Sequence, residues 1–501
     1  MTNWKSIGGS AAIITLLGST ATFADVTAAE VWQDWHDYMT GFGYEVTSQD
    51  EASGSTVTIN DLVISMNLPE DGGTIKVDFG KLTFKDQGDG TVAIIMPETM
   101  PVKISVEDEF AVTMTYNLSD MSMVVSGSAT EMTYTYSAAQ MGISIANLVI
   151  EGDKIDDAKL DVILTNMSGS TVSTTGNIRH MVQSFSSDML TYDFAIKEPD
   201  DGSFAMAVKG SIADFKGNSD SMIPNGVDFE QFAAALTAGF AAKGGLTWGA
   251  GGYEFSTTDR SDEVTGSSTS DSGSLDFGMD RDSIHYGGTA NGTKASFTSS
   301  DLPFPVDITI AESVFNLLMP VNKSDAPSDF GMTIKLGDFT VGDSIWGMID
   351  PGSILSRDPA TINLELDGKA NWLVDIMDPE SDEMAEVEIP GQLHALTLKA
   401  LQVKVAGADL TGSGAFTFNN DDLETFDGLP APTGALDLKL TGGNGLMDNL
   451  VKMSLLPEDQ AMGARMMMGL FAVVGDGDDT LTSKIEVSGD GSIMANGQRL
   501  K

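Results

Sequence analysis

The sequence predicts a mainly β protein built from large, curved antiparallel sheets. Apolar and polar residues alternate through most of the chain from about residue 56, and Gly- and Asp-rich turns separate the alternating segments. Helical periodicity is confined to a few short stretches. Because most connections between the segments are short, neighbouring strands are expected to pair as antiparallel meanders. The clearest strands are expected at residues 74–79, 111–118, 131–136 and 203–209.

One apolar pattern recurs along the predicted strands. Val57-x-Ile59-x-x-Leu62-x-Ile64 alternates, slips by one residue and alternates again, and residues 143–150, 334–341 and 396–403 repeat it. Such a slip reverses the facing of every later side chain unless a β-bulge absorbs it. The pattern therefore predicts long, bulged or bent strands that curve the sheet at several places.

A few amphipathic helices are expected at the ends of the sheets. Thr27 and Glu30 form a capping box that opens the first, which places Trp32 and Trp35 on one face and ends at Gly41. This face is expected to be buried, although it also fits a partner surface. Further helices are expected at 228–242, with Phe229, Phe232, Leu236 and Phe240 on one face and Gly244-Gly245 as its end, at 344–349, and at 444–471 with a break near Pro457.

These helices suggest two β-rich halves of related design that join near residues 217–227. The first half would cover residues 25–220, and the second residues 221–501. The Ser-, Thr-, Asp- and Gly-rich segment 256–274 is interpreted as a mobile loop.

The first residues have the order of a cleavable secretory signal. Lys5 is followed by an apolar run at 7–17 and by small residues at Thr22 and Ala24, so cleavage is expected after Ala24. The apolar run is shorter than the ~20 residues that span a bilayer. The alternative is an uncleaved anchor or a buried helix. The signal predicts export, and a periplasmic location for the mature chain.

The charge balance limits the kinds of partner that the protein can bind. The chain has 73 acidic and 27 basic residues, a net charge of −46, and the acids are spread along its length. Such a field repels nucleic acid and anionic lipid head groups, and favours a soluble monomer. No Cys is present, which excludes disulfides, thiolate zinc sites and Cys nucleophiles.

No catalytic motif is recognised, so the protein is predicted not to be an enzyme. The four His residues are widely separated, and neither a G-x-S-x-G elbow nor a Gly-rich nucleotide loop occurs. A carboxylate-dependent hydrolase stays open only because acids are abundant. Asp476, Asp478 and Asp479 place oxygen atoms on one turn, where calcium is an option, but turn formation is favoured as their role.

The 28 methionines offer the best candidate for a binding surface. Flexible apolar side chains suit adaptable binding surfaces as well as irregular cores. The resulting hypothesis is a non-catalytic protein whose curved sheet binds an apolar ligand, such as lipid, or an envelope partner. The alternative is an outer-membrane β-barrel, although aromatic residues are few for its girdles. The candidate residues for an apolar-ligand surface are Met114, Met121, Met123, Met132, Met466, Met467 and Met468.

Several short segments of the sequence are similar to those of a bacterial family. They are Ala29-Glu-Val-Trp-Gln-Asp-Trp35, Asp343-Ser-Ile-Trp-Gly-Met-Ile-Asp-Pro351, Ser356-Arg-Asp-Pro-Ala-Thr361 and Asp490-Gly-Ser-Ile-Met-Ala-Asn-Gly-Gln-Arg499. The chain resembles the family catalogued as domain of unknown function 2125, exported proteins of alphaproteobacteria. The resemblance implies an envelope or periplasmic setting and no established activity. The bent-strand pattern is also similar, at fold level only, to periplasmic β-groove proteins of the AsmA and TamB type.

Overall fold

The computed structural model describes residues 25–67, 73–106, 110–198, 203–227, 232–377 and 390–501. Within them the chain forms one antiparallel sheet of 27 strands, which confirms the mainly β fold. The expected signal at residues 1–24 lies outside the described residues. Among the residues described, no helix is both long and apolar enough to cross a membrane.

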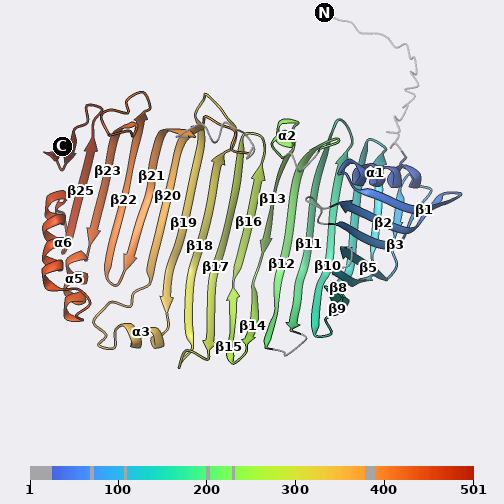
Figure 1. Cartoon of the computed structure of the whole chain (residues 1–501), viewed down its shortest axis with the longest axis horizontal. Coiled ribbons are helices and arrows are strands. Elements are labelled where there is room, and N and C mark those ends of the chain that lie inside the picture. The colour runs from blue at the N-terminus through green and yellow to red at the C-terminus, as the bar shows by residue number, and fades with distance from the viewer. Residues whose placement is uncertain (1–24, 68–72, 107–109, 199–202, 228–231, 378–389) are drawn as a thin grey trace, which may run out of the picture.

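The strands follow one another across the sheet as a meander (Figure 1). Nearly every strand pairs antiparallel with its sequence neighbours, and four long strands are each broken into two: β4 with β5, β6 with β7, β13 with β14, and β15 with β16. The first half of the strands comprises β1 Glu45–Ser53, β2 Thr56–Asn67, β3 Thr74–Asp86, β4 Val92–Ile95, β5 Thr99–Val106, β6 Phe110–Ser119, β7 Ser122–Ser128, β8 Glu131–Ile150, β9 Asp153–Lys154, β10 Ala158–Thr174, β11 Ile178–Lys197, β12 Phe204–Pro224 and β13 Ala241–Trp248.

The remaining strands continue the sheet to its other end. The sheet runs unbroken through β12, so the boundary expected near 217–227 falls within that strand and the turn after it. Whether the two halves are related in design stays a prediction. The remaining strands are β14 Gly251–Asp259, β15 Asp262–Ser270, β16 Ser272–Met279, β17 Ser283–Ser299, β18 Val306–Pro320, β19 Ser328–Val341, β20 Ala360–Trp372, β21 Gly391–Val405, β22 Ala408–Asn419, β23 Ala431–Thr441, β24 Val473–Val474, β25 Thr480–Val487, β26 Ile493–Ala495 and β27 Gln498–Arg499.

The predicted bulges are confirmed at all four positions. The pairing register shifts at four places: at residues 59–62 in β2, at 145–147 in β8 where it pairs with β6, at 336–339 in β19 and at 398–401 in β21. Ile59 and Leu62 flank the first bulge, and both are buried in the same core. The bulge therefore absorbs the slip and keeps the apolar residues on one face of the sheet.

A line of such slips crosses the central strands. Asn166, Asp214, Gly292 and Asp338 have φ between 50 and 62°, the left-handed region that Asn, Asp and Gly adopt most readily. The pairing register is the same before and after these positions. The reversal of side-chain facing therefore occurs at the same level in neighbouring strands. Apolar side chains before and after the line therefore share one face along the whole length of the strands.

The core lies at the N-terminal end, where helix α1 (Ala28–Gly41) packs on β2 to β8 (Figure 1). The predicted capping box is present, because the Thr27 hydroxyl accepts from the Glu30 amide and the Glu30 carboxylate accepts from the Thr27 amide. Trp32 is buried and Trp35 packs edge-on against the Phe84 ring. The prediction that this helix face is core is confirmed.

The other described helices lie at the borders of the sheet (Figure 1). α3 (Asp343–Ile349), α5 (Gly443–Lys452) and α6 (Glu458–Phe471) confirm the helices expected there, with the break at Pro457. α2 (Phe232–Thr237) is shorter than expected. Gly244 and Gly245 were wrongly assigned as its end, because they lie in β13, where the Phe277 ring covers Gly244. Phe229 lies outside the described residues.

The loop predicted at residues 256–274 is wrong, since this segment forms parts of β14, β15 and β16. Its small residues suit a strand here because neighbouring rings cover them. Gly266 lies under the Phe255 ring, and the Thr265 and Thr298 hydroxyls are 2.8 Å apart across two strands. Composition alone could not distinguish such strands from a Gly- and Ser-rich loop.

Candidate functional site

One face of the central sheet is apolar. Strand pairing places residues of successive strands directly opposite one another, and such residues point to the same side. Two adjacent rows thereby cross the sheet, the first formed by apolar residues and glycines from β11 to β20 and the second apolar from β16 to β20. The first row is Phe185, Gly217, Leu246, Leu275, Gly288, Phe315, Ile334 and Leu364, and the second includes Phe277, Tyr286, Leu317, Met332 and Leu366.

This apolar face is uncovered by the described part of the chain. Eleven large side chains on it are 38–49% exposed. If each exposes about 40% of roughly 200 Å², the exposed apolar area is on the order of 900 Å², more than the largest patch of a typical monomer. The eleven are Phe194, Ile196, Met206, Tyr253, Leu275, Phe277, Tyr286, Phe315, Ile334, Leu336 and Ile362.

The rings on this face lie flat against the sheet. A Cβ atom on Gly217 would stand 2.2 Å from Cε1 of Phe185, and one on Gly273 would stand 2.2 Å from Cζ2 of Trp248. Each of these two rings therefore fills the space above a glycine of the neighbouring strand, and Phe255 and Phe277 do the same over Gly266 and Gly244. Where a ring lies over a glycine, less of it projects from the sheet.

The opposite face carries the charges. Lys209 and Glu254 pair at 3.2 Å, Lys369 and Asp329 at 2.7 Å, and Lys335 pairs with Glu312. Apart from residues 259 and 262 at one hairpin turn, the charged residues of β12 to β20 fall on this polar face or at the bulges. The two faces of the sheet are thus segregated by charge over these strands.

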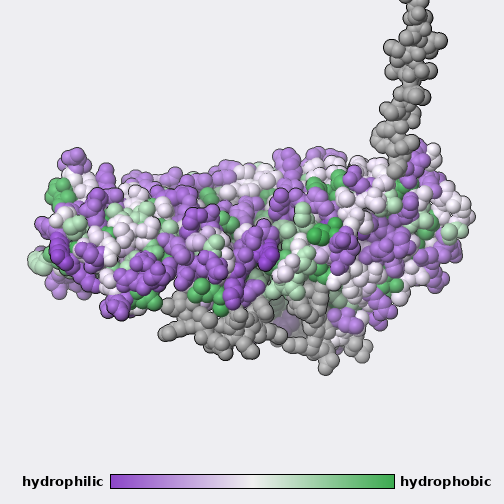
Figure 2. Space-filling view, turned by 90° about the horizontal axis from the view of Figure 1, so that it is seen from above, coloured by the Kyte–Doolittle hydropathy of each residue, from purple (hydrophilic) through white to green (hydrophobic). Residues whose placement is uncertain are grey.

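Polar residues also border the apolar face. Figure 2 looks onto the turns at the upper edge of Figure 1, where hydrophilic residues dominate and hydrophobic ones form small separate patches. The apolar face is consequently bounded by a mainly hydrophilic edge on this side.

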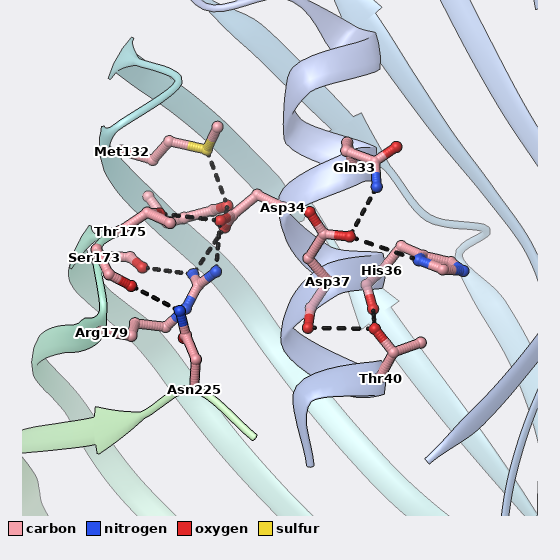
Figure 3. Close-up of polar contacts among 12 residues, drawn as sticks. Gln33, Asp34, His36, Asp37, Thr40, Met132, Ser173, Thr175, Arg179 and Asn225 are labelled. Carbon is pink, nitrogen blue, oxygen red and sulfur yellow. Dashed lines mark hydrogen bonds and ion pairs between the residues drawn. The ribbon is translucent and has the colours of Figure 1, made fainter. Parts of the chain in front are cut away.

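A buried ion pair closes the α1 end of the apolar face (Figure 3). Arg179 of β11 donates from both terminal nitrogens to Asp34 of α1, at 2.6 and 3.0 Å, and to the Ser173 hydroxyl at 2.9 Å. Asp34 also accepts from Thr175 and from the Tyr134 hydroxyl. The two charged side chains are only 9% and 8% exposed, so they neutralise each other away from water.

The tyrosines around this pair stay protonated. Burial raises the pKa of Tyr134 well above its usual value, and the Asp34 carboxylate raises it further. Burial likewise raises the pKa of Tyr38, although Arg179, which lies 5.2 Å from its ring centre, opposes this shift. Both phenols are therefore neutral and act as hydrogen-bonding or apolar groups at any physiological pH.

Between this pair and the open face lies a cavity of about 300 Å³, which we call the α1 slot. Trp35, Tyr38 and Met39 of α1 form its roof, and Tyr136 and Met181 of the sheet are among its floor residues. A second cavity, of about 400 Å³, lies at the far end of the sheet between α6 and β22 to β25. Its lining includes Leu438, Leu440, Phe471 and Ile485.

The candidate methionines divide between the two ends of the sheet. Met123 lines the α1 slot, while Met132 is buried in the core with its sulfur 3.3 Å from the Tyr134 hydroxyl. Met467 and Met468 line the α6 cavity, and Met466 is 68% exposed beside them. Met114 in β6 and Met121 after it are half-buried. The structure therefore does not gather the seven residues into one groove.

Asp479 has a defined role in the turn before β25. Its carboxylate accepts from the Gly445 amide at 2.8 Å and from the Asn444 amide and side chain, at the start of α5. Burial opposes ionisation, but these hydrogen bonds lower the pKa of Asp479. The carboxylate thus caps a helix, whereas Asp476 and Asp478 are exposed.

Sequence reasoning missed the residues that shape the site. Arg179 lacked any motif, and its partner Asp34 lies 145 positions away. The pairing of rings with glycines is visible only when the strand register is known. Comparisons with family models, curated proteins and solved structures find no match.

Proposed function

We propose that this protein binds the alkyl chains of a lipid-like ligand on the apolar face of its sheet. The observation that carries the proposal is a broad apolar face that the described residues leave uncovered, on strands β12 to β20 whose charged side chains, apart from residues 259 and 262 at one hairpin turn, lie on the other side or at the bulges. A single sheet normally covers such a face with a second layer. Covering it with ligand removes the same apolar area from water.

The shape of the face supports alkyl chains as the ligand. Protein interfaces gain specificity from anchors that enter pockets on the partner. Here Phe185, Phe255 and Phe277 lie over glycines, which leaves less of each ring to project as an anchor. Flexible chains can conform to a smooth surface of this kind. A protein partner on the envelope is the second candidate, because exposed apolar patches also mark protein interfaces.

The proposed role is non-catalytic and periplasmic. The secretion signal expected at residues 1–24 supports this location, and so does the resemblance to the exported family of unknown function. The apolar face consists of aliphatic and aromatic side chains and small residues, a composition that suits binding.

Two neighbouring residues of β18 give a matched test. Phe315→Glu places a carboxylate in the middle of the apolar face, whereas Asn316→Glu places one on the polar face. Desolvating a carboxylate costs several kcal/mol, so Phe315→Glu should weaken binding of N-phenylnaphthylamine at least about tenfold. Asn316→Glu should bind the dye as the natural chain does.

Native mass spectrometry and lipid extraction complete the test. Lipid should be retained by the natural chain and by Asn316→Glu, and depleted from Phe315→Glu. Equal dye affinity in the three proteins, with no lipid extracted from any of them, would rule the proposal out. A protein that co-purifies stoichiometrically, and is lost only from Phe315→Glu, would favour the envelope-partner alternative.

A further inference from the structure

We infer that the α1 slot receives the methyl end of an alkyl chain whose remainder lies on the apolar face. This inference rests on the proposed function and assigns one end of the bound ligand to a particular cavity. The slot is the place where the uncovered face runs beneath a helix, at the boundary with the N-terminal core.

The floor of the slot is continuous with the apolar face. Tyr136 of β8 stands opposite Gly169 of β10, which stands opposite Phe185 of β11. Phe185 begins the first apolar row that crosses the sheet. The Tyr136 ring covers Gly169 in the same way that the Phe185 ring covers Gly217. A chain lying along this row therefore reaches the slot, whose floor also includes the polar side chains of Thr171 and Gln183.

The closed end of the slot fits an apolar group rather than a head group. Its two charged residues, Asp34 and Arg179, bond to each other, and Asp34 also accepts from Tyr134 and Thr175. The ion pair is neutral overall and almost fully buried. A charged head group would have to break this buried pair, whereas a methyl end leaves it intact.

The volume of the slot is large enough for the end of an alkyl chain but too small for a whole lipid. Small-molecule sites usually enclose about 300–1,000 Å³, and the slot, at about 300 Å³, is at the lower limit. A diacyl lipid therefore cannot be enclosed, and most of its apolar surface must remain on the open face. The head group is left outside, towards the polar edges of the sheet.

Tryptophan quenching by brominated chains tests the inference directly. Trp35 lines the slot, and Trp248 lies on the open face over Gly273. Stearic acid and phosphatidylcholine, each brominated near the carbonyl or near the methyl end, are titrated into the full chain. The methyl-end bromine should quench more strongly than the carbonyl-end bromine, by twofold or more in the component that Trp35 contributes.

Two variants assign the signal. Trp35→Phe should abolish the difference between the two bromine positions. Trp346→Phe, in α3 with its ring against Arg357, should retain the difference, because α3 lies at the edge of the sheet away from the slot (Figure 1). Far-UV circular dichroism confirms that each variant is folded. A response to stearic acid alone would assign the ligand as a free single chain, and a response to both would assign the shared acyl chain.

The outcomes separate the inference from the proposed function. Quenching that persists in Trp35→Phe, without dependence on bromine position in the natural chain, overturns the slot assignment and keeps ligand binding on the face. Absence of quenching by every brominated chain overturns both. Quenching confined to Trp35 supports the slot and overturns the extended face as a binding surface.

Discussion

The buried ion pair between α1 and β11 makes a prediction about stability. Arg179→Met removes three hydrogen bonds, of 2.6, 3.0 and 2.9 Å, and leaves the Asp34 carboxylate 9% exposed without its counter-charge. Tyr134 and Thr175 still donate to that carboxylate, but neither carries a positive charge. Breaking a buried pair in this way costs about 3–5 kcal/mol. The free energy of unfolding should fall by that amount.

A double variant separates loss of the counter-charge from loss of the whole pair. Asp34→Leu combined with Arg179→Met removes both charges, and should restore stability to within about 1 kcal/mol of the natural chain. Lys369→Met is the control, because its pair with Asp329 is exposed and is worth at most about 1 kcal/mol. Urea unfolding, followed by tryptophan fluorescence, measures all four proteins. If Arg179→Met costs no more than Lys369→Met, the reasoning is refuted.

Two further predictions concern the sheet face and its C-terminal helix. Gly217→Ala must displace the Phe185 ring and should destabilise by about 1–3 kcal/mol in urea unfolding, whereas Gly278→Ala, with its nearest atoms at 3.7 Å, should cost far less. Equal costs would contradict the flat packing of the rings. Asp479→Asn replaces one of the two oxygens that accept from Asn444 and Gly445 with an NH2 group, so it should lower stability by about 1 kcal/mol at neutral pH, and Asp476→Asn should not. Because the pKa of Asp479 is lowered by folding, its contribution is present above the unfolded pKa near 4 and is lost as the pH falls through the folded value. A difference between the two variants that persists unchanged in acid would count against this cap.

The sequence was most informative where a periodic pattern had a local cause. The repeated slip predicted bulges, because only a bulge keeps Ile59 and Leu62 on one face, and the register confirms it at four sites. The alignment of the slips across the central strands could not be predicted. It depends on which strands are neighbours, and on left-handed residues such as Asp214 and Asp338 lying at the same level.

Prediction failed where the structural role of a residue depends on a neighbour that is distant in the sequence. Gly244 and Gly266 were interpreted as helix-ending and loop residues, because glycine disfavours regular structure by itself. In the sheet they lie under Phe277 and Phe255, whose rings supply the missing apolar contact. The methionines are a separate case. Their number indicated an adaptable surface, but the apolar face is formed mainly by aromatic and branched aliphatic residues.

The strong negative charge and the uncovered apolar face are best understood together. An exposed face of this size would normally drive copies of a protein to associate. The net charge of −46, whose carriers in β12 to β20 lie mostly on the polar face or at the bulges, makes two copies repel each other. The edge strand β1 adds Glu45, Asp50 and Glu51 where backbone groups are open to pairing. An uncharged alkyl chain experiences none of this repulsion. The charge therefore opposes association with other copies of the chain and with anionic surfaces, but it does not oppose the alkyl chains of the proposed ligand.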